Sequence, residues 1–324
     1  MLLALFVLLL IISLGLLIGW LVITQPLLVG AIPAAAKVSI SPARLEWHVR
    51  MLSTTYVPRD ATHPEHLDRV AAYIRQEFAQ ANARVVEQPY VVNGQTYRNV
   101  IGSYGPDTTE RIVIGAHYDA AGPYPGADDN ASGIAGLIEL AYLLGNVPLP
   151  IQVELIAYTL EEPPYFRTPL MGSAVHAQSL QAQGVPVRVM VSLEMIGYFN
   201  DAPNSQRFPA SILKLFYPSQ GNFIALVGKV GQGAVVRHAK RAMRGASSLP
   251  VYSINAPRLV PGVDFSDHRN YWAAGYPALM MTDTAFYRNP HYHTTYDTPD
   301  TVDYLRMAMV VQGVYAVVLA FAQT

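Results

Sequence analysis

The most apolar stretch of the chain lies at its start. Residues 1–36 carry no charged side chain, and residues 1–23 are almost wholly apolar. This length suits a bilayer span, which needs about 20 apolar residues, and it exceeds the roughly 7–15 residues of a signal-peptide core. We therefore expect residues 1–24 to form a transmembrane anchor and residues 25–44, which contain prolines and small residues, to form a linker.

A cleaved leader is the alternative for the same stretch. The small residues Ala34, Ala35 and Ala36 would suit a signal peptidase. Lys37 and the arginines after it favour a cytoplasmic location for the part of the chain that follows the span. The export of a large folded domain can override so weak a bias. We expect a single-pass membrane protein with an extracytoplasmic domain, or a secreted domain if the leader is cleaved.

Helix-like and strand-like segments alternate over the rest of the chain. Apolar residues recur at helical spacing in the segments 45–52, 64–82, 131–144, 172–183, 234–246 and 302–321. Short apolar or alternating runs predict strands at 84–92, 99–104, 111–116, 151–160, 187–196, 223–227, 250–254 and 278–282, with Asn93-Gly94 as a hairpin turn and Thr301 as the N-cap of the last helix. The alternation predicts one domain over residues 45–324, an α/β fold in which a three-layer α/β/α sandwich surrounds a mostly parallel or mixed sheet.

Composition narrows the chemistry of the chain. The formal net charge of its 324 residues is −1, which gives no indication of a nucleic-acid partner. Because the chain has no cysteine, it has neither disulfides nor a thiol nucleophile, and any metal must be held by His, Asp or Glu. The sequence does not predict an oligomeric state.

Polar residues follow the predicted strand at 111–116. His117 and Asp119 come directly after it, and Asp128 and Asp129 precede the next predicted helix. Ligands bind at the carboxyl ends of parallel strands in α/β sheets, and imidazole with carboxylate is a ligand set that zinc accepts. Taken alone, each pair also has an ordinary explanation as a surface hydrogen bond or a helix N-cap.

Further acids and histidines stand at comparable places. Glu161 and Glu162 end the predicted strand at 151–160, and because neighbouring side chains diverge, one can bind a metal while the other faces a water molecule. Glu194 lies in an apolar run, where an ionised carboxylate must be paired or bound to a metal. His291 or His293, near the C-terminus, could ligate as well. Their joint recurrence favours a metal site.

Taken in order, these motifs resemble those of the M28 metallopeptidases, the dizinc aminopeptidase group. The matching motifs are AHYD (116–119), PGADDNASG (125–133), EE (161–162), LEMIGYF (193–199), SDH (266–268) and HTTYDTPDT (293–301). The resemblance covers the chain from about Glu46 to its C-terminus. It implies a fold of the zinc-exopeptidase type and two zinc ions per chain.

The resemblance also implies a role for each matching residue. Asp129 would bridge both zinc ions and would be joined to Asn130 by a cis peptide bond. Glu161 would be the general base, and Asp119 would support the ring of His117. The complete set of implied ligands is His117, Asp129, Glu162, Glu194 and His293.

The chain departs from the family pattern at two places. Glu194 stands where many relatives have Asp, so the geometry or the metal preference of that site can differ. Some relatives also have a tyrosine before the SDH motif that holds the oxyanion of the reaction. This chain has Gly262-Val263-Asp264-Phe265 there, and either His268 or a tyrosine from another loop could take that role.

On this resemblance we expect a membrane-anchored dizinc exopeptidase that acts on peptides, most simply an aminopeptidase. A zinc acyltransferase like the glutaminyl cyclases, on the same fold, is one alternative. A catalytically inactive binding domain is another. The complete ligand set and Glu161 favour the peptidase. The loops at 199–220 and 255–263 are expected to line its substrate pocket.

Overall fold

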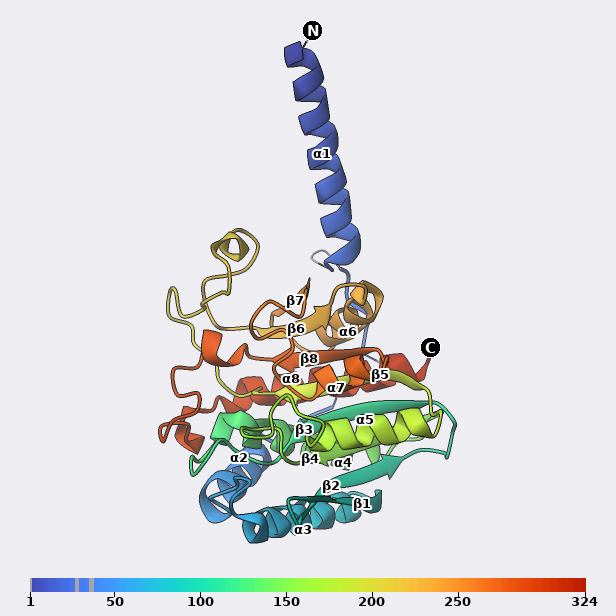
Figure 1. Cartoon of the computed structure of the whole chain (residues 1–324), viewed down its shortest axis with the longest axis vertical. Coiled ribbons are helices and arrows are strands. Elements are labelled where there is room, and N and C mark those ends of the chain that lie inside the picture. Colours follow the sequence, from blue (N-terminus) through green and yellow to red (C-terminus); the bar gives the residue numbers. More distant parts are fainter. Residues whose placement is uncertain (1, 27–28, 35–37) are drawn as a thin grey trace.

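A mixed eight-stranded sheet forms the centre of the computed structural model, which describes residues 2–26, 29–34 and 38–324 (Figure 1). The strand order is β1-β2-β4-β3-β5-β8-β6-β7. Neighbours β4, β3, β5 and β8 are parallel, whereas β2 pairs antiparallel with β1 and β4, and β6 pairs antiparallel with β8. The strands are β1 (Arg84–Val92), β2 (Gln95–Tyr104), β3 (Arg111–His117), β4 (Gln152–Tyr158), β5 (Val187–Glu194), β6 (Ile224–Lys229), β7 (Val251–Ala256) and β8 (Ala278–Thr282).

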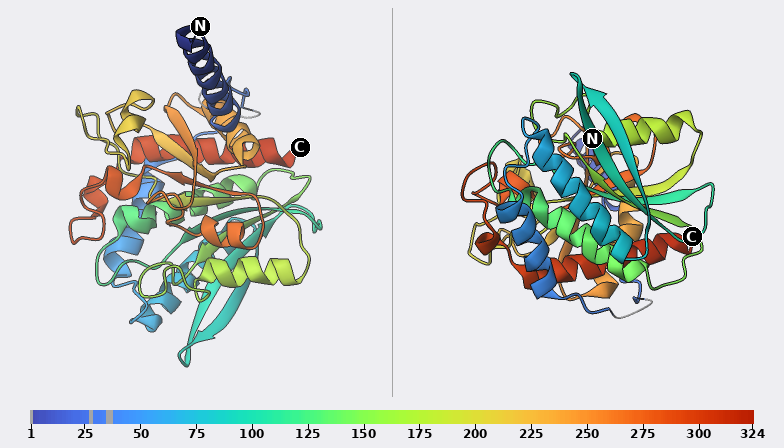
Figure 2. Two further views of the ribbon diagram at one scale, coloured as in Figure 1. Left: turned by 45° about the horizontal axis from the view of Figure 1, so that its top comes forward. Right: turned by 90° about the horizontal axis from the view of Figure 1, so that it is seen from below.

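Helices cover both faces of this sheet, and buried apolar side chains form one cluster on each face. The larger cluster includes side chains of α3, α4, α6 and α8, and Figure 2 shows α3, α4 and α8 lying across the same face. The smaller cluster includes side chains of α5 and α7. The helices are α1 (Leu2–Thr24), α2 (Pro42–Arg50), α3 (Pro64–Gln80), α4 (Gly133–Leu144), α5 (Gly172–Ala182), α6 (Gly233–Ala246), α7 (His268–Ala273) and α8 (Tyr304–Ala322).

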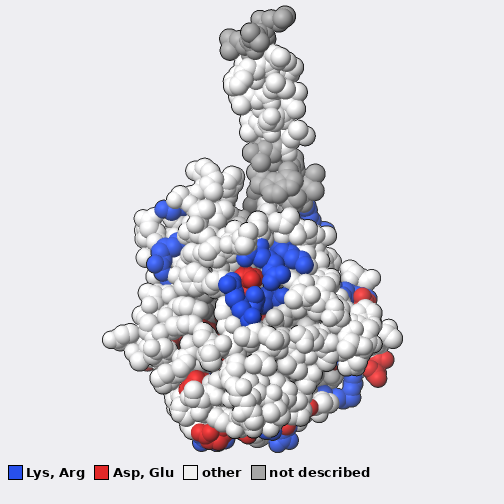
Figure 3. All heavy atoms as spheres, viewed as in Figure 1, with Lys and Arg blue, Asp and Glu red and all other residues white. Residues whose placement is uncertain are grey.

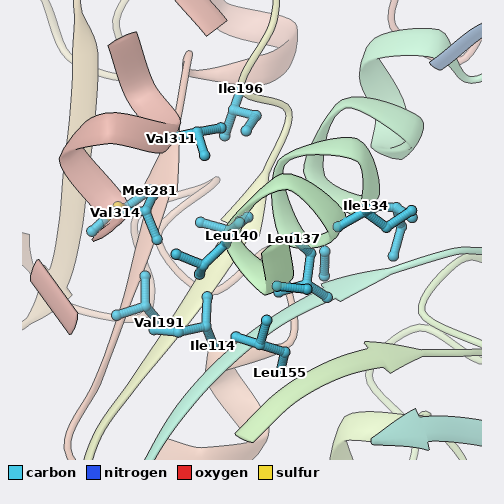
Figure 4. Packing of buried hydrophobic residues seen from close by; sticks show 14 of the residues in the cluster. Ile114, Ile134, Leu137, Leu140, Leu155, Val191, Ile196, Met281, Val311 and Val314 are labelled. Carbon is cyan, nitrogen blue, oxygen red and sulfur yellow. The ribbon is translucent and has the colours of Figure 1, made fainter. Parts of the chain in front are cut away.

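The two clusters follow from the alternation of side chains along each strand. In β3, Ile112 and Ile114 belong to the larger cluster, and Val113 between them belongs to the smaller one. Figure 4 shows how α4 packs on the centre of the sheet through Leu137 and Leu140, which lie near Ile114, Leu155 and Val191. Complete burial of such a side chain contributes about 1.5–3 kcal/mol. This packing fixes the position of α4, and with it the loop that precedes the helix.

Three predicted helix starts differ from the structure, and the first of them is that α2 begins at Pro42 and not at residue 45. Asp303, and not Thr301, is the N-cap of α8, because its carboxylate accepts the backbone N–H of Arg306 at 2.9 Å and Pro299–Thr301 form a separate 3₁₀ turn. Helix α4, expected from residue 131, begins at Gly133 and follows a π-helical turn, Ala127–Ser132, with non-helical dihedral angles at Asp129 and Asn130. The predicted long loop at 199–220 contains a short 3₁₀ helix, and α7 was not predicted.

Helix α1 projects away from the domain (Figure 1). Its described side chains, those of residues 5–16, are exposed. Among the described residues, the helix that is long and apolar enough to cross a membrane is α8, but 67% of its apolar window is buried. We therefore interpret α8 as a core helix of the domain. Ala35, Ala36 and Lys37, on which the alternative of a cleaved leader depends, lie outside the described residues.

Candidate metal centre

The carboxyl ends of three parallel strands bring the predicted residues together. His117 is the last residue of β3, Glu194 is the last residue of β5, and Glu161 and Glu162 follow β4. Because β3 lies between β4 and β5, acidic side chains from both neighbours meet at His117. All four side chains are buried, with 0–6% of each residue exposed.

Two groups of three side chains lie at this edge of the sheet, and Asp129 belongs to both. In the first group, His117 Nε2 lies 3.3 Å from Glu194 Oε2 and 3.6 Å from Asp129 Oδ1. In the second group, His293 Nε2 lies 3.1 Å from Asp129 Oδ2 and 3.2 Å from Glu162 Oε1. The two oxygens of Asp129 thus face different groups, as those of a bridging carboxylate would. We call these two groups the first and the second triad.

The chemistry of the atoms that face the triads fits a pair of cations. Within the described part of the chain, four buried atoms there make no hydrogen bond: His117 Nε2, Asp129 Oδ2, Glu162 Oε1 and His293 Nε2. A buried polar atom without a partner costs about 1–3 kcal/mol, and carboxylates this close repel one another. Divalent cations would remove both costs, and a set of imidazoles and carboxylates suits zinc. The donor set therefore fits one zinc ion in each triad.

Asp119 connects the two triads through its carboxylate and its backbone. Its carboxylate accepts the backbone N–H of Glu162 at 3.0 Å. Its carbonyl oxygen lies 3.1 Å from Nδ1 of His117, while its carboxylate lies 3.6 Å from the same nitrogen. Groups that bind the second nitrogen of a ligating histidine fix its ring and its tautomer. Asp119 can therefore orient both His117 and the backbone of Glu162.

Glu161 lies at the edge of the first triad and belongs to neither group. Its Oε2 lies 3.9 Å from His117 Nε2. Burial raises the pKa of Glu161 well above its usual value; His117 opposes this shift, and Glu162 and Glu194 add to it. The acidic cluster thus needs positive charge nearby to remain ionised at neutral pH. A buried carboxylate beside the ligands but outside them is placed to exchange protons.

Several supporting residues were not identified from the sequence. The carboxylate of Asp297 accepts the backbone N–H groups of Asp128 and Asp129 at 2.9 and 3.0 Å. The guanidinium of Arg59 is buried and donates to four carbonyl oxygens around this loop. Asp297 lies inside the HTTYDTPDT motif, which is the one signal that could have pointed to it. Arg59 has no local pattern that marks it.

The loop between β3 and α4 is also fixed from the side of β5. The peptide bond between Asp129 and Asn130 is cis, as the family resemblance implied. The side chain of Asn130 donates to the carbonyl oxygen of Leu193 at 2.8 Å and accepts the backbone N–H of Met195 at 3.1 Å. These bonds tie the loop that carries Asp129 to the end of β5, next to Glu194.

The other histidines and tyrosine near the centre, His291, His268 and Tyr292, belong to neither triad. The ring of His291 packs edge-on against Tyr198 with centroids 6.1 Å apart. His268 is buried against Trp272, and its Nε2 lies 2.8 Å from the carbonyl oxygen of Val263, so it is held away from the centre. Tyr292, which the sequence analysis did not identify, stacks on His293 with ring centroids 3.8 Å apart. Burial raises its pKa, and the charges of the surrounding acids raise it further.

An apolar pocket opens beside Glu194. Both predicted loops contribute to its walls, which include Phe208, Leu213, Tyr217, Val260 and Val263. Phe223 and Tyr252, which pack edge-on with ring centroids 5.0 Å apart, also line it. An uncharged side chain would fill this space without leaving a polar group unpaired.

Comparison with known sequences adds independent findings. The family profile described as "Peptidase family M28" matches residues 99–318. The "Uncharacterized protein YfbL" of Escherichia coli (strain K12) is 48% identical over 294 residues, which cover 88% of this chain and 90% of that protein. "Leucine aminopeptidase 1" of Fusarium vanettenii is 24% identical over 253 residues, which cover 74% of this chain and 57% of that protein. The chain thus spans little more than half the length of that relative.

Comparison with solved structures supports the fold. A zinc aminopeptidase from Bacillus subtilis, BSAP, superposes with a TM-score of 0.71 at 15% identity, covering 87% of this chain and 95% of that one. A glutaminyl cyclase from Bacteroides thetaiotaomicron, bound to N-acetylhistamine, superposes with a TM-score of 0.67 at 18% identity, covering 88% of this chain and 99% of that one. At such identities the likeness concerns the fold alone.

Proposed function

The chain belongs to peptidase family M28 and is a zinc metallopeptidase, and from this premise we propose that it is a membrane-anchored dizinc aminopeptidase. The observation that carries the proposal is the pair of triads that share Asp129, with unpaired buried atoms facing both. His117, Asp129 and Glu194 would hold one zinc ion, and Asp129, Glu162 and His293 would hold the other. Zinc at such a site, when bound, lowers the pKa of water and polarises a carbonyl group.

The chain's own residues would then carry the proton transfers and position the peptide. Glu161 would accept the proton of the attacking water and donate it to the leaving amine. Glu162 and Glu194 would attract the positively charged α-amine of the substrate, which favours cleavage at the amino end. Tyr292, stacked on His293, is the candidate that donates a hydrogen bond to the developing oxyanion. The apolar pocket beside Glu194 would receive the side chain of the first residue.

A matched pair of peptides tests this function. The zinc-loaded full-length protein, in detergent, is incubated with a peptide that begins with leucine and with its N-acetylated form, and the products are identified by mass. We expect loss of single residues from the free amino end and no cleavage of the blocked peptide. Cleavage from the carboxyl end, or of both peptides alike, contradicts an aminopeptidase.

An activity like that of glutaminyl cyclases is the second candidate, because the fold superposes on such an enzyme over 99% of its chain. A peptide that begins with glutamine distinguishes the two, since a cyclase releases ammonia and leaves the peptide at full length. An inactive binding domain would change neither peptide. The two complete triads and the buried Glu161 support the peptidase.

We also propose that α1 is a membrane anchor (residues 1–24) followed by a connection (residues 25–44) and an extracytoplasmic peptidase domain (residues 45–324). The exposed apolar side chains of residues 5–16 support the anchor. Directly after α1 the chain contacts the domain: Gln25 exchanges two hydrogen bonds with the backbone of Asn255, and Lys240 donates to the carbonyl oxygen of Pro26 at 2.7 Å. These contacts would hold the domain close to the bilayer.

Membrane washing tests the anchor. We expect the full-length protein to stay in the membrane fraction after high-salt and carbonate washes, because the transfer of about 20 apolar residues into a bilayer is not reversed by salt or pH. A chain that starts at Ser41 should be soluble. Release of the full-length protein by carbonate would contradict the anchor, and a mature N-terminus at Lys37 would indicate a cleaved leader instead.

A further inference from the structure

Three arginines surround a single buried carboxylate near the metal centre. The nearest guanidinium nitrogens of Arg167, Arg269 and Arg258 lie 2.8, 3.5 and 3.9 Å from the carboxylate oxygens of Asp264. Figure 3 shows such a gathering of basic side chains around one acidic group in the middle of this face. One carboxylate balances only one of the three charges, so the cluster keeps an excess of two positive charges in a chain whose formal net charge is −1.

This arginine cluster is connected to the candidate ligands through two loops. Arg167 follows Phe166, whose backbone N–H donates to the carbonyl oxygen of Glu162 at 3.2 Å. Asp264 lies two residues before Ser266, whose hydroxyl donates to Glu194 at 2.6 Å. The cluster therefore lies directly beyond the loops that position one ligand of each triad.

Aromatic rings lie against two of the three guanidinium groups. The guanidinium of Arg167 lies 4.8 Å from the ring centre of Phe265, and that of Arg269 lies 5.5 Å from the ring centre of Phe166. Phe265 also lines the apolar pocket, so the cluster adjoins its rim. A stacked guanidinium loses little freedom when it binds, and its planar fork matches a carboxylate. Arg167 and Arg258 remain 46% and 45% exposed, so an anion in solution can reach them.

The position of the cluster indicates which part of a peptide would reach it. The apolar pocket lies beside Glu194, whereas Arg167 lies on the loop that follows Glu161 and Glu162. If Glu161 protonates the leaving amine, the leaving part of the peptide lies on its side of the centre. All three arginines line a hollow between α5 and α7.

We propose that the arginine cluster binds a carboxylate on the leaving side of the peptide, so that the preferred substrates are short or acidic peptides. The carboxylate can be the C-terminal group of a dipeptide or tripeptide, or an acidic side chain soon after the cleaved bond. This inference rests on the proposed peptidase function and specifies its substrate class. Asp264 keeps the three guanidinium groups together, and the excess positive charge attracts the ligand.

Two pairs of probes separate the sources of the carboxylate. The first pair is Leu-Gly-Gly as the free acid and as the amide. The second pair is Leu-Gly-Glu-amide and Leu-Gly-Gln-amide. For wild-type protein we expect a KM about 5–10-fold lower for the charged member of at least one pair, because one such charge pair contributes about 1 kcal/mol and this acts on binding rather than on turnover.

Two variants that each remove one positive charge, one inside the cluster and one outside it, are compared with the wild type. In Arg258→Gln, the arginine with the longest contact to Asp264 is removed, and we expect the KM ratio of the charged and uncharged peptides to fall below 3-fold. Arg69→Gln removes an exposed arginine of α3, outside the cluster, and should keep the wild-type ratio. The same KM ratio in the wild type and Arg258→Gln, or no ratio in the wild type, overturns the inference while leaving the peptidase function intact.

If wild-type protein cleaves none of the four peptides, the peptidase function fails, and binding then tests the inference by itself. Calorimetric titration with the same peptides should still give a tighter Kd for a charged member, and Arg258→Gln should remove the difference. Equal affinity for both members of each pair overturns the proposal.

Discussion

Glu161 and Glu162 are neighbours in the chain, yet their carboxylates have different surroundings. Glu162 Oε1 lies 3.2 Å from His293 Nε2 and belongs to the second triad. Glu161 Oε2 lies 3.9 Å from His117 Nε2 and belongs to neither triad. This difference follows from the divergence of consecutive side chains at a strand end, and it supports the proposed roles of Glu162 as a ligand and Glu161 as the proton carrier.

Exchange of each glutamate for glutamine should therefore give opposite results. Glu161→Gln keeps the shape of the side chain but cannot accept a proton, so it should retain both zinc ions and lose turnover by about 10²–10⁴-fold. Glu162→Gln replaces an anionic ligand with a neutral amide and should lose or loosen one zinc ion. Zinc content measured beside turnover distinguishes the two variants. Metal loss in Glu161→Gln with two ions kept in Glu162→Gln would reverse the assignment.

At the scale of elements, the loop that carries Asp129 is held by groups from distant parts of the chain. Asp297 binds its backbone from the C-terminal motif, and Asn130 ties it to β5. Buried backbone N–H groups need an acceptor, and Asp297 provides it for Asp128 and Asp129. The position of Asp129 thus depends on a side chain 168 positions away.

Asp297→Ala tests this support. Removal of the acceptor leaves two buried N–H groups without a partner, so the free energy of unfolding should fall by about 1–3 kcal/mol. Zinc affinity should fall about 10–100-fold, as for other groups that orient metal ligands. Denaturant unfolding and zinc competition measure the two effects. Asp300→Ala, at a carboxylate with 79% of its side chain exposed, is the control and should change neither by a comparable amount. Equal effects of both substitutions would contradict the supporting role.

The strands and the residues at their ends were predictable because both leave a local signal. β3, β4 and β5 are short apolar runs that are buried along almost their whole length, and acids or a histidine stand at or just after their ends, so the apolar run and its polar end locate them. The supporting groups leave no such signal. From the sequence alone, Arg59 would be expected at the surface. Its supporting role depends on the fold, which brings carbonyl oxygens from separate turns around its guanidinium. The N-cap at Asp303 was missed because Thr301, two residues earlier, has an equally suitable side chain.

At the scale of the whole molecule, buried histidines outside the metal centre link stability to pH. Burial, with a smaller effect of Arg111, lowers the pKa of His176 to about 3, and burial with Arg44 lowers that of His48 to about 4. Both imidazoles stay neutral in the folded chain, whereas in the unfolded chain they take up protons near pH 6.5. The unfolded state therefore binds more protons below pH 6.5, and stability must fall with pH there.

We expect the free energy of unfolding to decrease as the pH falls from about 6.5 towards 4, by up to about 1.4 kcal/mol per pH unit for each histidine. Above pH 6.5 these two residues contribute no slope. Urea unfolding at a series of pH values, with a chelator present throughout, measures the effect. His176→Gln can still bond Tyr271, which lies 2.6 Å from His176 Nδ1, and should reduce the slope by about one proton. If His176→Gln leaves the pH dependence of the free energy of unfolding unchanged, the proposed effect of His176 is contradicted.

The most direct test of the account is a zinc titration of the metal-free, full-length protein, with bound zinc and the release of leucine from a leucyl peptide measured together. The two triads that share Asp129 predict that two zinc ions bind per chain and that the rate reaches its maximum only with the second ion. Full activity with a single bound zinc, or two bound ions without release of leucine, would contradict the account.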